Sequence, residues 1–252
     1  MSEVLLVCAI VMLCCVFINV VSRKFDMPAL LLFMALGMIF GSDGIFKIPF
    51  DNYEIMQQIS TIALILIIFY GCYFGKMFIQ RKKGIQTDQI GKGKVGVVKL
   101  IELTMKVTTI AVPVVEVISI FLNTLGLPAS MRYVGIIVAL IGDLVFICSV
   151  VTMRDSWRAG VSETDKTELV TNGIYQISRN PAFLGFNLVY IGIVMMFFNW
   201  VLFAFSVFAM IMFHLQIVNV EEEFLFKTFG KEYADYKKKV NRYLGRRVMR
   251  YK

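Results

Sequence analysis

Two long apolar runs, separated by one short turn, decide the fold of this chain. They read AFLGFNLVYIGIVMMFF (residues 182–198) and VLFAFSVFAMIMFHLQIV (residues 201–218). A helix rises about 1.5 Å per residue, so each run approaches the ~30 Å thickness of a bilayer's hydrocarbon core. Only Asn199 and Trp200 separate them. The sequence therefore predicts a helical hairpin within a membrane.

The remaining sequence is similarly apolar. Of its 252 residues, 58% are hydrophobic and 17% are charged. This composition is far from the soluble average and predicts an all-α, multi-spanning membrane protein with about seven hydrophobic segments. The other five runs are residues 4–21, 28–40, 56–74, 97–122 and 133–151. The run 28–40 is short, so it either crosses with help from its flanks or lies as a broken helix.

The distribution of charge predicts the orientation in the membrane. The net charge is +8, and most Lys and Arg fall in alternate loops and in the C-terminal tail. The positive-inside rule then places Arg23 and Lys24, the loop around 81–94 and the C-terminus in the cytoplasm. If the run 28–40 does not cross, the N-terminus changes side and the loop around 81–94 and the C-terminus stay in the cytoplasm. We expect an integral protein of a bacterial inner membrane that contacts lipid and no nucleic acid.

The sequence predicts neither a metal site nor a disulfide framework. His214 is the only histidine, and the cysteines show no metal-ligand spacing. Their apolar surroundings favour packing. The five cysteines are Cys8, Cys14, Cys15, Cys72 and Cys148.

Polar, glycine-punctuated segments flank the hairpin on both sides. The first reads LVTNGIYQISRNPAFLG (residues 169–185). The second begins with EEEFL (221–225) and continues with Phe229-Gly230, Tyr233, Tyr236 and Arg242. Charged, irregular backbone at a membrane is costly unless it builds a site. The order and spacing resemble the isoprenylcysteine carboxyl methyltransferase family, over about residues 66–252.

The resemblance implies a reaction and a set of site residues. It implies transfer of a methyl group from S-adenosyl-L-methionine to a lipophilic acceptor, a carboxylate of the isoprenylcysteine type, at a cytoplasmic site. The catalytic residues implied are Arg179, Glu222 and Arg242. Those implied for the cofactor are Gly173, Tyr175, Asn180, Pro181, Leu184, Gly185, His214 and Glu221. Two positions depart from the family pattern: Asn180 replaces His, and Phe183 replaces Tyr.

Elementary chemistry fits this set. A carboxylate acceptor is already ionised near neutral pH, so it needs orientation by a cation more than it needs a base. Pro181 predicts a loop that ends there and a helix that begins there. The three residues Glu221, Glu222 and Glu223 point about 100° apart on a helix, so they cannot share one role. The segment 156–160 precedes the site, and two interpretations are open: Trp157 anchors it at the membrane interface, or the segment covers the cofactor.

The N-terminal part differs in character. Residues 28–44, 50–54 and 58–65 resemble the opening helices of bacterial cation/proton antiporters, with Gly37, Gly41 and Gly44 in register. An antiporter needs acidic residues inside many more spans, and the first three spans here contain none. We therefore expect residues 1–65 to be a membrane anchor and residues 66–252 to be the methyltransferase domain.

Three other functions remain open from the sequence. The chain is a transporter fragment or non-catalytic membrane protein if Glu102, Glu116 or Asp143 faces a central cavity. It is a degenerate methyltransferase if Asn180 has cost it activity. It is a phospholipid-amine N-methyltransferase if the acceptor is a lipid amine. Glu102 and Lys106 stand four residues apart and predict an intrahelical ion pair. The sequence leaves the oligomeric state unknown.

Overall fold

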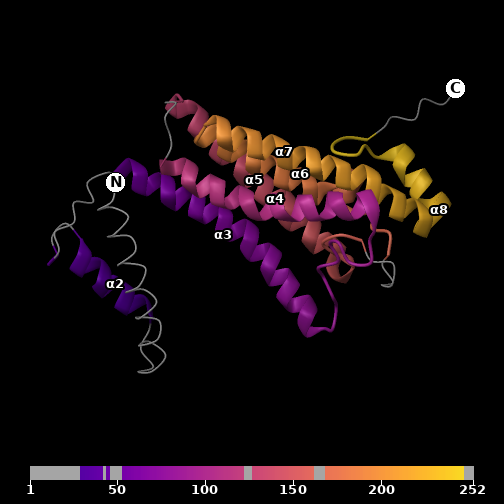
Figure 1. The fold of residues 1–252 in the computed structure, drawn as a ribbon, viewed down its shortest axis with the longest axis horizontal. Coiled ribbons are helices and arrows are strands. Elements are labelled where there is room, and N and C mark those ends of the chain that lie inside the picture. The colour runs from indigo at the N-terminus through magenta and orange to yellow at the C-terminus, as the bar shows by residue number, and fades with distance from the viewer. Residues whose placement is uncertain (1–28, 42–43, 46–52, 122–126, 162–167, 247–252) are drawn as a thin grey trace. The chain divides into compact units, whose positions relative to one another are not determined.

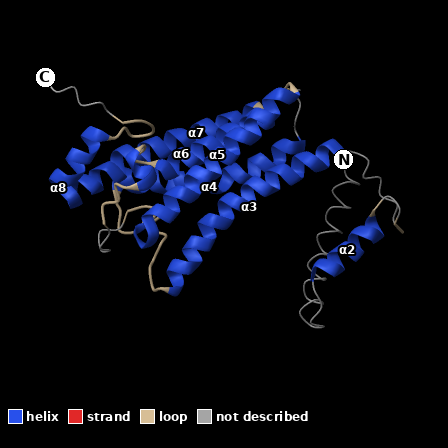
Figure 2. Cartoon of the chain, turned by 180° about the vertical axis from the view of Figure 1, so that it is seen from behind, coloured by secondary structure: helices blue, strands red, loops and turns tan. Residues whose placement is uncertain are grey.

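A computed structural model describes residues 29–41, 44–45, 53–121, 127–161 and 168–246 of the chain. The predicted first span, 4–21, and three of the cysteines lie outside these residues. The described segments are helical apart from turns and two isolated bridges, as Figure 2 shows, so the all-α expectation is confirmed for them. The chain divides into two compact units, Met1–Met56 and Gln57–Lys252.

The described helices follow the predicted apolar runs closely. The first unit contains α2 (Ala29–Phe40), whose 12 residues extend about 18 Å. The long helices of the second unit are α3 (Tyr53–Lys82, which begins just before it), α4 (Gly96–Phe121), α5 (Ala129–Met153), α6 (Pro181–Met196), α7 (Trp200–Gln216) and α8 (Glu222–Lys239). Short turns are η1 (Arg154–Ser156), η2 (Gly173–Gln176) and the π-helical η3 (Ile217–Glu221).

Three of the described helices are long and apolar enough to cross a membrane. These segments are Met56–Lys82, Ser130–Ser156 and Trp200–Lys239. Helix α6 is apolar but shorter, and α4 carries Glu102, Lys106 and Glu116 along its length. The structure thus supports an integral membrane protein, and the count of seven spans stays a prediction.

Helices α4 to α7 run alongside one another, and α8 continues from the end of α7 (Figure 1). Glycines bring α5 and α6 into close contact. A Cβ atom on Gly185 would lie 2.9 Å from the carbonyl oxygen of Gly142, and one on Gly192 would lie 2.5 Å from that of Gly135. Small residues at such interfaces let helix backbones approach in a bilayer.

A cluster of aromatic rings joins α3 to this pair. Phe69 of α3 packs on Phe146 of α5 and on Phe186 of α6, with ring centroids 4.4 and 4.5 Å apart. Tyr190 and Phe213 extend the cluster to α7, and all five rings are buried. The core therefore lies next to the polar segments before α6 and after α7.

The predicted boundary at Pro181 is confirmed, because α6 begins at this residue and Asn180 is non-helical. The predicted ion pair between Glu102 and Lys106 is wrong. Lys106 Nζ instead lies 2.7 Å from Asp88 Oδ2, and Glu102 accepts hydrogen bonds from the Gly91 amide and from Gln216. The loop between α3 and α4 supplies Asp88 and Gly91, and α7 supplies Gln216, so spacing along one helix does not reveal these partners.

Candidate functional site

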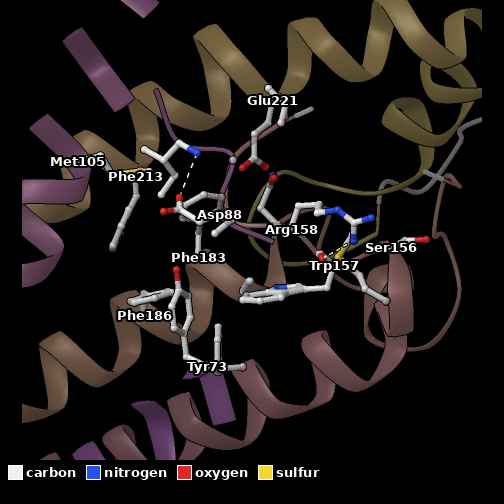
Figure 3. Close-up of a pocket in the computed structure, with 18 of the residues that line it drawn as sticks. Tyr73, Asp88, Met105, Ser156, Trp157, Arg158, Phe183, Phe186, Phe213 and Glu221 are labelled. Atoms are coloured by element: carbon white, nitrogen blue, oxygen red, sulfur yellow. Dashed lines mark hydrogen bonds between the residues drawn. The ribbon is translucent and has the colours of Figure 1, made fainter. Parts of the chain in front are cut away.

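A cavity of about 580 Å³ lies within the second unit (Figure 3). Its volume is in the range of roughly 300–1,000 Å³ that is usual for small-molecule sites. Its walls come from α3, α4, α6, the segment after α5, and the junction of α7 with α8. The segments that the sequence analysis singled out, 169–185 and 221–236, both contribute residues to it.

One part of the cavity is aromatic and apolar. Tyr73, Trp157, Phe183 and Phe186 lie together there, as Figure 3 shows. Tyr73 and Trp157 meet edge to face, with ring centroids 5.4 Å apart. Such walls bind apolar chains, and the faces of the rings also attract cations.

The other part of the cavity is polar. Asp88, Arg158 and Glu221 lie on this side in Figure 3. Lys106, Glu168, Arg179 and Asn180 also line the cavity. The cavity therefore fits a ligand, or a pair of ligands, with one charged end and one apolar end.

The loop after α3 pairs with the segment after α5 to form one wall. The Gln89 amide donates to the Ala159 carbonyl at 2.8 Å, and the Ala159 amide donates to the Thr87 carbonyl at 3.0 Å. Buried Gln80 joins both sides, because its Nε2 donates to the Trp157 carbonyl while its Oε1 accepts from Thr87. These bonds hold Trp157 and Arg158 in the wall.

An ion cluster lies beside the cavity and centres on Glu222. Its carboxylate is 2.7 Å from Arg242 Nε, 2.9 Å from Lys237 Nζ and 3.1 Å from Arg179 Nη1. Glu222 and Arg179 are both buried. The hydrogen bond that Arg242 donates to the Glu222 carboxylate raises the pKa of Arg242 above its ordinary value, so this guanidinium remains charged.

The same cluster ties the chain's last described loop to the start of α6. Arg179 Nε donates to the Val240 carbonyl at 3.1 Å, and Arg179 Nη1 donates to Tyr233 Oη at 2.8 Å. Asn180 Nδ2 donates to the Arg242 carbonyl at 3.0 Å. The segments 178–181 and 240–242 are thus fixed against each other, although about 60 residues separate them in sequence.

Tyr175 anchors the turn η2 to α5. Its hydroxyl is 2.8 Å from Ser149 Oγ of α5, and its carbonyl accepts a 2.6 Å hydrogen bond from Tyr236. Burial raises the pKa of Tyr175 well above its ordinary value, so the phenol stays neutral. Tyr175 and Tyr236 both line the cavity.

The three consecutive glutamates have three different surroundings, as helix geometry predicts. Glu223 is exposed and pairs with Lys227 at 2.7 Å. Glu222 is the buried centre of the ion cluster. Glu221 lines the cavity from the end of the π-turn η3. Among the described residues, no hydrogen bond or ion pair reaches the Glu221 carboxylate, which leaves it available to a ligand.

The structure brings only part of the predicted site to the cavity. Tyr175, Arg179, Asn180 and Glu221 line it. The remaining predicted residues lie outside the lining: Gly173, Pro181, Leu184, Gly185, His214, Glu222 and Arg242.

Each of these outer residues has a visible structural role. Gly173 has φ of +56° and abuts Thr152, and Gly185 is at the α5–α6 contact. Pro181 starts α6, and the Leu184 amide donates to the Asn180 carbonyl in its first turn. His214 Nδ1 is 2.9 Å from Tyr243 Oη, which adds a further link to the last loop.

The sequence analysis missed Asp88 and Lys106 as lining residues. Asp88 belongs to a loop that shows no motif. Lys106 was assigned to a pair within its own helix. A signal was present, because Lys106, Thr109, Ile110 and Pro113 form one stripe along α4 and all four line the cavity.

Comparison with known proteins identifies the part of the chain that contains this site. Residues 131–232 match the phospholipid methyltransferase family. A probable protein-S-isoprenylcysteine O-methyltransferase of Oryza sativa subsp. indica is 30% identical over 113 residues, which are 44% of this chain and 59% of that protein. The protein-S-isoprenylcysteine O-methyltransferase of Dictyostelium discoideum is 32% identical over 113 residues, 44% of this chain and 48% of that protein.

The chain thus spans about half the length of the curated relatives that it matches. The family match includes Tyr175, Arg179, Glu221 and Glu222, and it ends before Arg242. Lys106 and Asp88 precede it. These similarities support a methyltransferase, and residues 131–232, from α5 into α8, are the part that matches the phospholipid methyltransferase family.

Proposed function

We propose that this protein transfers a methyl group from S-adenosyl-L-methionine to a lipophilic acceptor within the cavity. The observation that carries the proposal is Glu221, a carboxylate with no protein partner among the described residues, at the polar side of a cavity with aromatic walls. An unpaired, part-buried carboxylate is unfavourable by itself and becomes favourable when a cationic ligand binds.

The lining residues fit this methyl donor. When bound, S-adenosyl-L-methionine supplies an electrophilic methyl group on a positively charged sulfur. Glu221 complements a cation, Asn180 offers amide hydrogen-bonding groups, and the rings of Trp157 and Phe183 offer π faces. The wall formed by segments 87–89 and 157–160 excludes water, so that these charges act in a less polar environment.

We assign the ion cluster a positioning role. Glu222 and Arg242 lie outside the cavity lining, and Arg179 lines it while its guanidinium contacts Glu222 and Tyr233. These residues fix the end of the π-turn against the loop before α6, and therefore fix Glu221 and Asn180, which both line the cavity. Precise placement of this kind supplies much of the rate in a displacement reaction.

We propose a carboxylate on an apolar molecule as the acceptor, of the isoprenylcysteine type named in the relatives. The apolar part of the cavity suits a prenyl or acyl chain. A lipid amine is the second candidate, because residues 131–232 match a family described as phospholipid methyltransferase.

In both cases the acceptor is lipophilic, and we propose that it arrives through the bilayer while the cofactor arrives from the cytoplasm. Residues 1–65 then serve as an additional membrane anchor.

The first test is cofactor binding to the purified protein in detergent by calorimetry. Glu221→Gln keeps the shape of the side chain and removes its charge. We expect it to weaken S-adenosyl-L-methionine binding by about 10- to 100-fold, which is the usual value of a charge-assisted contact. Glu223→Gln is the matched control, since Glu223 is exposed and turned away from the cavity. We expect wild-type affinity for this variant. Absence of saturable binding by the folded wild-type protein contradicts the proposed function.

A further inference from the structure

Lys106 lines the cavity, and the proposed function gives it no role. Its Nζ lies 2.7 Å from Asp88 Oδ2, and both residues line the cavity. The nearby Lys92 Nζ donates to the Asp88 carbonyl oxygen at 2.6 Å. A lysine within an apolar helix of a membrane protein is a functional candidate by default.

Lys106 is the one charged residue of α4 that lines the cavity. The stripe of Lys106, Thr109, Ile110 and Pro113 is charged at Lys106 and mostly apolar beyond it, and Met105 of the same helix also lines the cavity. This stripe is about 10 Å long. Helix α3 contributes a second stripe at the same spacing, formed by Tyr70, Tyr73, Phe74 and Met77. A molecule whose apolar chain lies along these stripes presents its polar end to Lys106.

The ion pair with Asp88 is suited to exchange. The side chains of Lys106 and Asp88 are 39% and 31% exposed, and ion pairs this accessible contribute only about 0–1 kcal/mol. Asp88 keeps other contacts without Lys106, because its Oδ1 accepts from the Ile90 amide at 3.3 Å. A ligand carboxylate can therefore replace Asp88 at Lys106 at little cost to the loop.

We propose that Lys106 is the residue that binds the carboxylate of the methyl acceptor, in place of Asp88. This inference rests on the proposed function and assigns the side chain that selects its acceptor. In the transfer, one acceptor oxygen forms the bond to the methyl carbon as the sulfur–carbon bond breaks, and the sulfur keeps the electron pair. No proton moves. The methyl ester product is uncharged, so it loses its attraction to Lys106, and Asp88 takes its place again.

The test measures acceptor binding independently of activity. The chain has two tryptophans, and Trp157 lines the cavity, so a Trp200→Phe background leaves a single reporter in the wall. The probes are an N-acetylated S-farnesylcysteine and its carboxamide, which lacks the charge. We expect the carboxylate to bind about 10- to 100-fold more tightly than the carboxamide. Lys106→Gln removes this preference, Lys106→Arg keeps it, and neither changes binding of the carboxamide.

The partner variant separates ligand binding from a structural role. Asp88→Asn removes the competing charge and keeps an acceptor for the Ile90 amide, so we expect tighter binding of the carboxylate. If Lys106 only fixes the loop, Asp88→Asn and Lys106→Gln weaken both probes equally, and the inference is wrong. Lys83→Gln is the matched control, because Lys83 pairs with Asp155 at 2.8 Å outside the cavity lining, and its carboxylate preference is expected to equal that of the wild type.

Two further outcomes distinguish this inference from the proposed function. Tighter binding of an amine-bearing lipid by Lys106→Gln, with no preference for the carboxylate in the wild type, overturns the role of Lys106. Cofactor binding is measured by calorimetry on the same preparations. A protein that selects the carboxylate through Lys106 but binds no S-adenosyl-L-methionine contradicts the proposed function and leaves the carboxylate site in place.

Discussion

At the scale of single residues, the consecutive glutamates show how one helix separates binding from positioning. Glu221 lines the cavity without a protein partner, whereas Glu222 is buried and contacts Arg179, Lys237 and Arg242. A buried carboxylate with three cationic partners stabilises the fold. An unpaired carboxylate beside a cavity does not, and natural proteins retain such groups where function requires them.

Glu222→Gln is therefore expected to destabilise the protein, whereas Glu221→Gln is not. Loss of the Glu222 charge leaves the buried Arg179 without its counter-ion, and breaking a buried pair typically lowers the free energy of unfolding by about 3–5 kcal/mol. Thermal unfolding in detergent measures both variants. An equal melting temperature for Glu222→Gln and the wild type would show that the ion cluster does not hold the site together.

At the scale of helices, the α5–α6 contact depends on glycine. A Cβ on Gly142 would lie 2.8 Å from the Gly185 carbonyl oxygen and 2.8 Å from the Val189 amide nitrogen, and neither backbone atom can move easily. We expect Gly142→Ala to lower the free energy of unfolding by about 1–3 kcal/mol, as overpacking usually does. Gly71→Ala is the control within α3, where a Cβ meets no atom within 4 Å. It should be neutral or stabilise by up to about 1 kcal/mol. Similar losses in both variants would argue against the close approach.

The sequence predicts the helices well because their signals are local. Apolar runs and the proline at position 181 determine where α6 begins, and the structure confirms this boundary. The partners of Lys106 are not local. Asp88 reaches it through a loop whose position depends on hydrogen bonds to Ala159. Gly185 is a second example. Its place in a motif predicts a cofactor contact, whereas the structure places it at the contact between α5 and α6.

At the scale of the whole second unit, the loop before α6 is held by a segment that follows it by about 60 residues in the sequence. Residues 240–246 hydrogen-bond to the segment before α6: the Arg179 amide donates to the Asn241 carbonyl at 3.1 Å, and the Gly245 amide donates to the Ile177 carbonyl at 2.8 Å. Arg246 adds contacts with Gln176. The family match ends at residue 232, so residues 240–246 lie beyond it.

Truncation after Lys239 is expected to weaken cofactor binding at least tenfold and to leave the helices intact. The deletion removes Arg242 and the carbonyl groups that accept hydrogen bonds from Arg179 and Asn180, so the cavity wall loses its fixed geometry. Circular dichroism should show nearly unchanged helix content, since the deleted residues contain no helix among those described, and calorimetry should show affinity reduced at least tenfold. Truncation after Arg246 keeps every contact named here and should bind as the wild type does. If both truncations bind the cofactor equally well, the last loop does not position the site, and Glu221 must be held by α7 and the π-turn alone.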